Sequence, residues 1–258
     1  MLAVDLRLAL DPVSFAREAL GFDPDPWQAD VLRSVSRRLL LNCSRQSGKS
    51  TTAAVLALHQ AIYYPASLVL LVSPSLRQSS ELFRKVADLL GALAEKPELL
   101  EDNRLSCTLA NRSRIVSLPS SEATIRGFSG AALIVEDEAA RVPDELYRAV
   151  RPMLAVSGGR LILMSTPFGK RGHFFEEWTN GGPIWQRVQI TANDCPRITA
   201  EFLAEERPSF GDWWFRQEYQ CEFVETTDQA FAYEQVMAAL TPDVPPLFLG
   251  GGLNGHTR

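Results

Sequence analysis

The chain is poor in cysteine and lysine, and it contains no long apolar segment. Its four cysteines show no C-x-x-C spacing, so the sequence favours neither a zinc site nor a disulfide framework. No apolar run approaches the roughly 20 residues that a membrane-spanning helix needs, and the N-terminus has no signal-peptide pattern. We therefore expect a soluble protein of the cytoplasm, with reduced thiols and no membrane contact.

An excess of positive charge is also absent. The formal net charge is -5 and the isoelectric point is about 5.4, whereas a broad nucleic-acid-binding surface normally brings surplus lysine and arginine. Any DNA contact must therefore be local. The only lysines are Lys49, Lys85, Lys96 and Lys170, so Lys49 is conspicuous because it follows a glycine in a loop-like stretch.

Apolar runs alternate with amphipathic segments between residues 38 and 190. The pattern predicts strands at residues 38–42, 68–73, 114–118, 132–136, 160–165 and 185–190, and helices at residues 49–63, 75–94, 143–153 and 172–179. This order is typical of an α/β fold with a mostly parallel sheet between layers of helices. We expect a core at residues 1–190, a helical, aromatic-rich lid or linker subdomain at 191–240 and a flexible tail at 241–258.

The stretch "CSRQSGKS" lies between a predicted strand and a predicted helix and resembles a phosphate-binding loop. In the pattern G-x-x-x-x-G-K-[ST], backbone N–H groups wrap the phosphates, the lysine reaches the β and γ oxygens and the hydroxyl binds Mg²⁺. Cys43 replaces the first glycine, but the closest phosphate contacts come from the helix start, so binding can survive the replacement. The predicted nucleotide-binding residues of this loop are Ser44, Arg45, Gln46, Ser47, Gly48, Lys49, Ser50 and Thr51.

A second motif, "ALIVEDEAA", is an apolar run that ends in Asp137 and Glu138. Beside a phosphate loop, an Asp in this position holds Mg²⁺ together with Ser50, and the adjacent Glu activates the attacking water. Taken alone, the motif also fits a strand that ends in solvated acids. Together with Lys49 it predicts a nucleotide-binding site that uses Mg²⁺, and Glu138 favours hydrolysis over transfer to an acceptor.

These motifs resemble the large terminase subunit of tailed bacteriophages, the ATP-driven motor that packs double-stranded DNA into a capsid. The resemblance is carried by "RQSGKS", by "DPWQADVL" upstream of it, by "IRGFSGAALIVEDEA", by "LILMSTPFGKRGHFFEEW" and by "WWFRQEYQCEFVETTDQAF". They occur in the family's order over roughly residues 20 to 235. The resemblance implies a RecA-like (ASCE) P-loop fold with a small C-terminal helical lid subdomain.

The resemblance also implies roles for single residues. Gln28 would hydrogen-bond the adenine edge, and Arg45 would sense the γ-phosphate in its own subunit. Arg126 would act as an arginine finger on a neighbouring subunit, and Ser165 and Thr166 would couple hydrolysis to lid movement. A surface salt bridge remains the alternative for Arg45, an ordinary loop position for Arg126, and a strand-end cap for Ser165 and Thr166.

In the family, a ribonuclease-H-like nuclease domain with a metal-binding Asp cluster normally follows the motor. Here the sequence ends in "PPLFLGGGLNGHTR", near where the first nuclease strand would begin. We therefore expect an isolated motor domain without nuclease activity. One motor fold supplies half a nucleotide site, so a homo-oligomeric ring on the capsid portal would complete it, and the isolated chain would be a monomer. Double-stranded DNA and the small terminase subunit are the expected partners.

Three functions compete. The leading one is the DNA-packaging ATPase of the bacterial host cytoplasm. A P-loop kinase is disfavoured by Glu138, and a decayed prophage remnant that binds ATP without motor activity remains an alternative. DNA-stimulated phosphate release separates the three, because only the motor shows it.

Overall fold

The computed structural model describes residues 2–120, 127–225 and 233–239 of the chain. Residues 1–224 form one compact unit. Residues 225–258 form a second one, in which helix α11 (Tyr233–Ala239) is described by itself. The expected tail at 241–258 lies outside the described residues. The sheet and the candidate site discussed below belong to the first unit.

One eight-stranded sheet forms the centre of the first unit, in its described part. Its strands are β1 (Arg38–Cys43), β2 (Leu68–Ser73), β3 (Leu99–Asn103), β4 (Ser106–Leu109), β5 (Arg114–Pro119), β6 (Leu133–Asp137), β7 (Arg160–Ser165) and β8 (Gln186–Ile190). Their order is β3-β4-β5-β2-β6-β7-β1-β8. The strands from β5 to β8 along this order are parallel, whereas β4 and β3 join the edge in antiparallel pairings.

The central strands read as nearly continuous apolar runs because both faces of the sheet are covered. Strand β6 is buried at all five positions, and β1, β2 and β7 are buried at every position after the first. In the register of β7, Ser165 pairs with Asn42 of β1 and Met164 pairs with Asp137 of β6. The carboxyl ends of the three strands therefore meet at one edge of the sheet, where α/β folds bind ligands.

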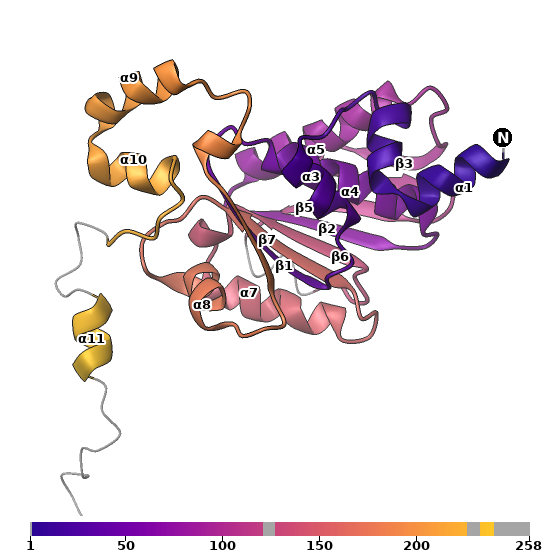
Figure 1. Ribbon diagram of the computed structural model, residues 1–258. Helices are drawn as coiled ribbons and strands as arrows, with labels where there is room; N and C mark the ends of the chain where they lie inside the picture. The colour runs from indigo at the N-terminus through magenta and orange to yellow at the C-terminus, as the bar shows by residue number, and fades with distance from the viewer. Residues whose placement is uncertain (1, 121–126, 226–232, 240–258) are drawn as a thin grey trace, which may run out of the picture. The chain divides into compact units, whose positions relative to one another are not determined.

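Helices cover the two faces of the sheet (Figure 1). One face carries α3 (Pro26–Arg33), α4 (Lys49–Tyr63) and α5 (Leu76–Ala92), and the other carries α7 (Asp144–Val150) and α8 (Gly172–Asn180). Each face has its own hydrophobic cluster. The N-terminal helices α1 (Leu2–Leu10) and α2 (Pro12–Ser14) and the π-helical turn η1 (Phe15–Ala19) precede α3. None of the described helices is long and apolar enough to cross a membrane.

A small helical lid follows β8. It consists of the 3-10 turn η4 (Ala192–Asp194), α9 (Ala200–Phe210) and α10 (Asp212–Glu218). Gly211, with a φ of 81°, separates the two helices, because a left-handed backbone ends α9 and is strained for other residues. Ala192, Leu203 and Phe215 form a separate small core. The lid thus has its own packing and joins the sheet through the segment after β8.

The predicted α/β fold, with its mostly parallel sheet, is confirmed, and most predicted strands and helices agree with the structure to within one or two residues. Two differences have physical reasons. The helix expected at 143–153 ends at Val150 and continues as the 3-10 turn η3 (Arg151–Leu154), because Pro152 cannot donate the next helical hydrogen bond. The β3–β4 hairpin was not predicted, because β3 reads "LLEDN" and is mostly exposed.

Candidate active site

The phosphate-loop sequence connects β1 to α4 and turns sharply at Gly48. Gly48 precedes α4 with a φ of 96°, a left-handed conformation that favours glycine. A Cβ atom at this position would lie 2.7 Å from Gln28 Nε2 and 3.2 Å from Arg197 Nη2. The left-handed backbone therefore favours glycine here, and a larger residue would also have to displace the ends of the Gln28 and Arg197 side chains.

The missing first glycine of the loop pattern has a simple structural explanation. Cys43 is the last residue of β1, where it pairs with Ile190 of β8, and it is fully buried. Its neighbour Ser44 is also buried, and the Ser44 N–H donates to the carbonyl of Ile190 over 2.8 Å. Since the loop leaves the strand only after these residues, a side chain at 43 does not occupy the phosphate-binding turn.

The backbone of the turn presents free donors. Among the described residues, the N–H groups of Gln46 and Gly48 have no protein acceptor, whereas the Ser47 N–H closes a tight turn that begins at Ser44. The Ser47 side chain is fully buried and contacts the Cys43 thiol. Donors that converge before a helix N-terminus form a typical anion-binding site.

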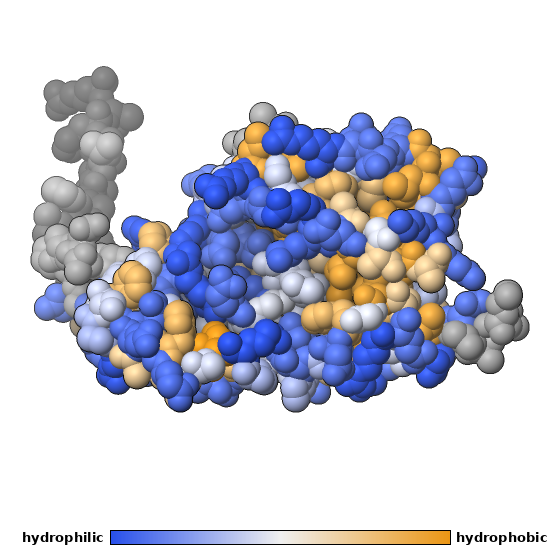
Figure 2. All heavy atoms as spheres, turned by 90° about the horizontal axis from the view of Figure 1, so that it is seen from above, coloured by the Kyte–Doolittle hydropathy of each residue, from blue (hydrophilic) through white to orange (hydrophobic). Residues whose placement is uncertain are grey.

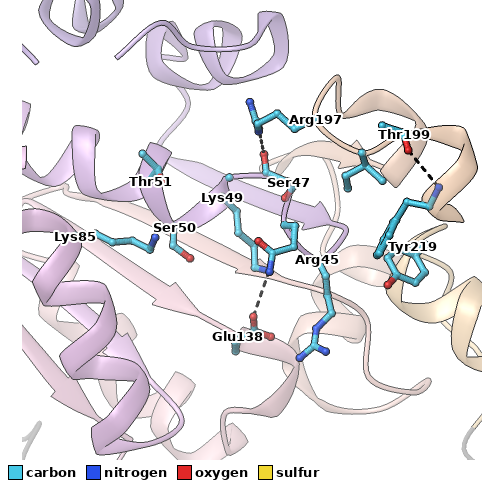
Figure 3. Close-up of a pocket in the computed structure, with 14 residues that line it drawn as sticks. Arg45, Ser47, Lys49, Ser50, Thr51, Lys85, Glu138, Arg197, Thr199 and Tyr219 are labelled. Atoms are coloured by element: carbon cyan, nitrogen blue, oxygen red, sulfur yellow. Dashed lines mark hydrogen bonds and ion pairs between the residues drawn. The ribbon is translucent and has the colours of Figure 1, made fainter. Parts of the chain in front are cut away.

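Lys49 begins α4 and extends into the site, where its Nζ lies 3.2 Å from Glu138 Oε1 (Figure 3). Burial opposes the charge on this lysine, but the carboxylates of Glu138 and Asp137 outweigh it and raise the pKa of Lys49. Lys49 is therefore a protonated ammonium with 8% of its surface exposed. It is available as a cation for phosphate oxygens.

The acidic pair follows directly from β6. Burial, reinforced by the neighbouring charge of Glu138, raises the pKa of Asp137 to about 6, while Lys49 and a hydrogen bond from Ser50 oppose the rise. Glu138 adopts a φ of 52°, a left-handed conformation that is uncommon for glutamate and concentrated at functional sites. The turn places its carboxylate beside Lys49, and the Ser50 hydroxyl lies close enough to the Asp137 carboxylate to lower its pKa.

A cleft of about 950 Å³ lies in front of the loop. Its walls are formed by Arg45, Gln46, Ser47, Gly48, Lys49, Ser50 and Thr51 of the loop, by Lys85 of α5, by Glu138, and by Arg197, Ile198, Thr199, Phe202 and Tyr219 of the lid segment. The face seen in Figure 2 is predominantly hydrophilic on the side of the lid. The cleft thus combines basic side chains with the loop backbone and one carboxylate at its base, a composition that suits an anionic ligand.

Gln28 is buried beneath the loop rather than presented to the cleft. Its Oε1 accepts from the Asp25 N–H over 2.8 Å, and its Nε2 donates to Thr52 Oγ1 over 3.0 Å and to the Gly48 carbonyl over 3.4 Å. The adenine contact expected for Gln28 would require these bonds to be exchanged, and that role stays a prediction. In this structure the amide connects α3 to the phosphate loop.

The coupling residues lie at the end of β7. Ser165 is fully buried and its hydroxyl has no partner among the described residues. Thr166 is also buried, and its Oγ1 accepts from Arg141 Nη1 over 3.2 Å. Arg45 is exposed on the loop, and its Nε lies 3.3 Å from the buried Glu218 of α10. The structure therefore places Ser165 and Thr166 at the same edge of the sheet as Arg45. Their roles in coupling and in sensing the γ-phosphate stay predictions.

Sequence reasoning missed four side chains at the site. Arg197 donates to the Ser47 carbonyl over 2.9 Å and to Asp25 over 3.0 Å, and so connects the lid segment to the loop. Lys85, Arg141 and Glu218 contribute further charges. The scarcity of lysine could have identified Lys85, but no short motif marks the other three. Arg126, the expected finger, lies outside the described residues.

The residues present fit magnesium and a nucleoside triphosphate. Ser50 and Asp137 offer the hard oxygen ligands that Mg²⁺ prefers, and they lie next to each other. The turn supplies unpaired N–H donors and Lys49 supplies a cation. Glu138 lies across from Lys49, where it could accept a proton from a water molecule.

Comparisons with known proteins identify the family to which the chain belongs. A sequence model of the family described as "Terminase large subunit, T4likevirus-type, N-terminal" matches residues 40–237. The terminase large subunit of Thermus virus P23-45 is 29% identical over 250 residues, which cover 83% of this chain and 52% of that protein. The chain thus spans about half the length of the curated relatives that it matches.

Solved structures share the fold. The large terminase ATPase domain of Thermus phage P74-26 superposes with a TM-score of 0.75 at 25% identity, over 83% of this chain and 100% of that domain. The HK97 bacteriophage large terminase shares the fold alone, with a TM-score of 0.69 at 15% identity over 83% of this chain and 55% of that protein.

Proposed function

The chain belongs to the family of phage terminase large subunits, and on that premise we propose that it is an ATP-hydrolysing motor domain for packaging double-stranded DNA. The observation that carries the proposal is the convergence of Lys49 and Glu138 at 3.2 Å across a turn with unpaired N–H donors. A phosphate-binding loop and a carboxylate suited to activating water are the two requirements of an ATPase of this fold. The proposal assigns both to this one cleft.

In the proposed reaction, the loop amides and Lys49 hold the phosphates, and Arg45 contacts the γ-phosphate. Glu138 orients the attacking water and accepts its proton. Ser50 and Asp137 would hold Mg²⁺, which supplies neutralising charge to the phosphate oxygens when bound. Ser165 and Thr166, at the end of β7, are proposed to report the state of the γ-phosphate to the lid.

We further propose that the protein acts as a ring of identical subunits on a capsid portal in the host cytoplasm, with the small terminase subunit as a partner. Arg126 of one subunit would complete the charge stabilisation in its neighbour. We expect no DNA cleavage by this chain, since Asp137 and Glu138 are assigned to the nucleotide. Because the net charge of the chain is -5, we expect its contacts with DNA to be confined to a small part of its surface.

Phosphate release by the full chain, measured with and without linear double-stranded DNA, tests the proposal. We expect magnesium-dependent release that rises when DNA is added. Transfer of phosphate to an acceptor, without release to water, would identify a kinase. ATP binding without turnover at any protein concentration, with or without DNA, would identify a remnant and reject the motor.

A further inference from the structure

Arg141 connects the catalytic carboxylate to two other parts of the molecule. It lies in the 3-10 turn η2 (Ala139–Arg141) that follows Glu138. Its Nη1 donates to Glu138 Oε2 over 3.1 Å and to Thr166 Oγ1 over 3.2 Å, and its Nη2 donates to Glu218 Oε1 over 3.3 Å. The guanidinium also lies 4.6 Å from the centre of the Phe168 ring. One planar cation therefore touches the ends of β6 and β7 and the lid helix α10.

Arg141 is the middle member of a row of alternating charges. Lys49 pairs with Oε1 of Glu138, and Arg141 pairs with Oε2. Arg141 also pairs with Oε1 of Glu218, whose Oε2 lies 3.3 Å from Arg45 Nε. Both ends of the row, Lys49 and Arg45, belong to the phosphate loop. Each carboxylate thus has one partner in the loop and shares Arg141 as the other.

Glu218 is almost fully buried, with 1% of its surface exposed. A buried carboxylate is stable only when cations and hydrogen bonds compensate for its lost hydration. The two cations described for it are Arg45 and Arg141, which gives the lid a strong preference for the position in which both contacts are made. Movement of the lid would therefore disturb the contacts of Arg141.

A bound triphosphate changes this balance. A loop lysine that reaches the β and γ oxygens can no longer neutralise Glu138 to the same degree, and Arg45 would turn toward the γ-phosphate. Arg141 is then the cation that remains in contact with both Glu138 and Glu218. Its guanidinium is suited to this because it presents several N–H donors in a rigid plane.

We propose that Arg141 is a positioning residue that holds Glu138 in place for water activation only while Glu218 of the lid holds the other side of its guanidinium. This inference rests on the proposed ATPase function and adds to it a regulatory link, since the position of the lid controls the orientation of the carboxylate. Thr166 adds the end of β7 to the same contact. Arg141 acts through Glu138 and is assigned no contact with ATP or the attacking water.

The test is a double-mutant cycle with Arg141→Ala and Glu218→Gln, in which kcat and KM for ATP are measured with saturating DNA. We expect Arg141→Ala to lower kcat by on the order of 10²-fold, because a misplaced catalytic group costs about that much, while KM changes little. Glu218→Gln should lower kcat less, and it should add almost nothing in the Arg141→Ala background. Arg216→Ala, which removes an exposed ion pair on the same helix, is the matched control.

The outcomes separate the inference from the function on which it rests. A wild-type chain without turnover rejects the ATPase, and the inference with it. A wild-type chain that turns over while folded Arg141→Ala keeps normal kcat rejects only the inference, and so do independent, multiplicative effects of the two substitutions. If Arg141→Ala fails to fold, Arg141→Lys replaces it in the cycle. The lysine ammonium is a single nitrogen and lacks the planar fork by which Nη1 and Nη2 of Arg141 reach different partners, so Arg141→Lys should also lose kcat at constant KM.

Discussion

Glu138 combines several energetically unfavourable features in one residue. Its backbone occupies the left-handed region, and its carboxylate lies between two cations beside another buried acid. A strained residue persists only where its surroundings hold it in place. The contacts from Lys49 and Arg141 supply that restraint. This arrangement is consistent with a carboxylate that is positioned for function and not for the stability of the fold.

At the residue scale, the sequence predicted the site residues that are neighbours within one motif. It did not predict the contacts between residues that are far apart in the chain. Gly48, Lys49 and Ser50 lie in one short motif, and Asp137 and Glu138 in another, so their proximity follows from the fold. The contact between Arg141 and Glu218 joins residues 77 positions apart, on a lid whose docking no local pattern encodes. The partners of the Gln28 amide could not be predicted either, because they depend on how α3 packs against α4.

A substitution of Gln28 distinguishes recognition of the adenine base from structural support of the phosphate loop. Gln28→Ala leaves the Asp25 N–H and Thr52 Oγ1 without their partner, so we expect the free energy of unfolding to fall by about 1–3 kcal/mol. Because the amide already uses its donors and acceptor, affinity for ATP and GTP should fall by the same factor. Titration with both nucleotides, together with denaturant unfolding, measures the two effects. A loss confined to ATP would instead support adenine recognition by Gln28.

At the element scale, the parallel strands were predictable because their apolar runs are long and buried on both faces. The β3–β4 hairpin was not, since its first strand is exposed and carries acidic residues. The contact between β6 and α8 was also unforeseen. The two ring nitrogens of His173 of α8 lie 2.6 Å from a carboxylate oxygen of Glu136 of β6 and 3.1 Å from one of Asp144 of α7, and the ring stacks on Tyr147 at 4.4 Å.

This contact predicts a pH dependence of stability. Burial opposes protonation of His173, but the hydrogen bonds and charges of Glu136 and Asp144 outweigh it and raise its pKa above the ordinary 6.5. The folded state therefore binds this proton more tightly than the unfolded chain. The resulting stabilisation is fully present below pH 6.5 and is lost as the pH rises through the raised folded pKa.

Thermal unfolding of wild type and His173→Gln across neutral pH tests this. We expect the difference in Tm between them to be largest at acidic pH and to shrink at alkaline pH. His59→Gln is the control with the opposite sign, because burial lowers the pKa of His59. A constant difference in Tm for His173→Gln at all pH values would contradict the assignment of a charged His173.

At the scale of the whole molecule, the proposed function predicts that one such fold supplies only half of a nucleotide site. We expect an isolated chain to bind ATP and hydrolyse it slowly, with specific activity rising with concentration. If Arg126 acts between subunits, Arg126→Ala should lower the rate by roughly 10³ to 10⁵, as arginine fingers do, with little change in affinity.

Mixing two inactive variants tests this arrangement. Lys49→Ala lacks a working phosphate loop and Arg126→Ala lacks the finger, so only a mixed interface combines an intact loop with an intact finger. Recovered ATPase activity in the mixture is the expected result. No recovery, with co-assembly confirmed by light scattering, would place Arg126 outside the neighbour's site.

The most direct test of the account compares wild type with Glu138→Gln in DNA-stimulated ATP hydrolysis, with ATP binding measured on the same samples. The substitution keeps the size of the side chain and removes the charge that accepts the proton. We predict unchanged or tighter ATP binding and a rate lower by on the order of 10²-fold or more, whereas Lys49→Ala should weaken binding itself. Near-normal hydrolysis by a folded Glu138→Gln protein would contradict the assignment of this cleft as the ATPase site.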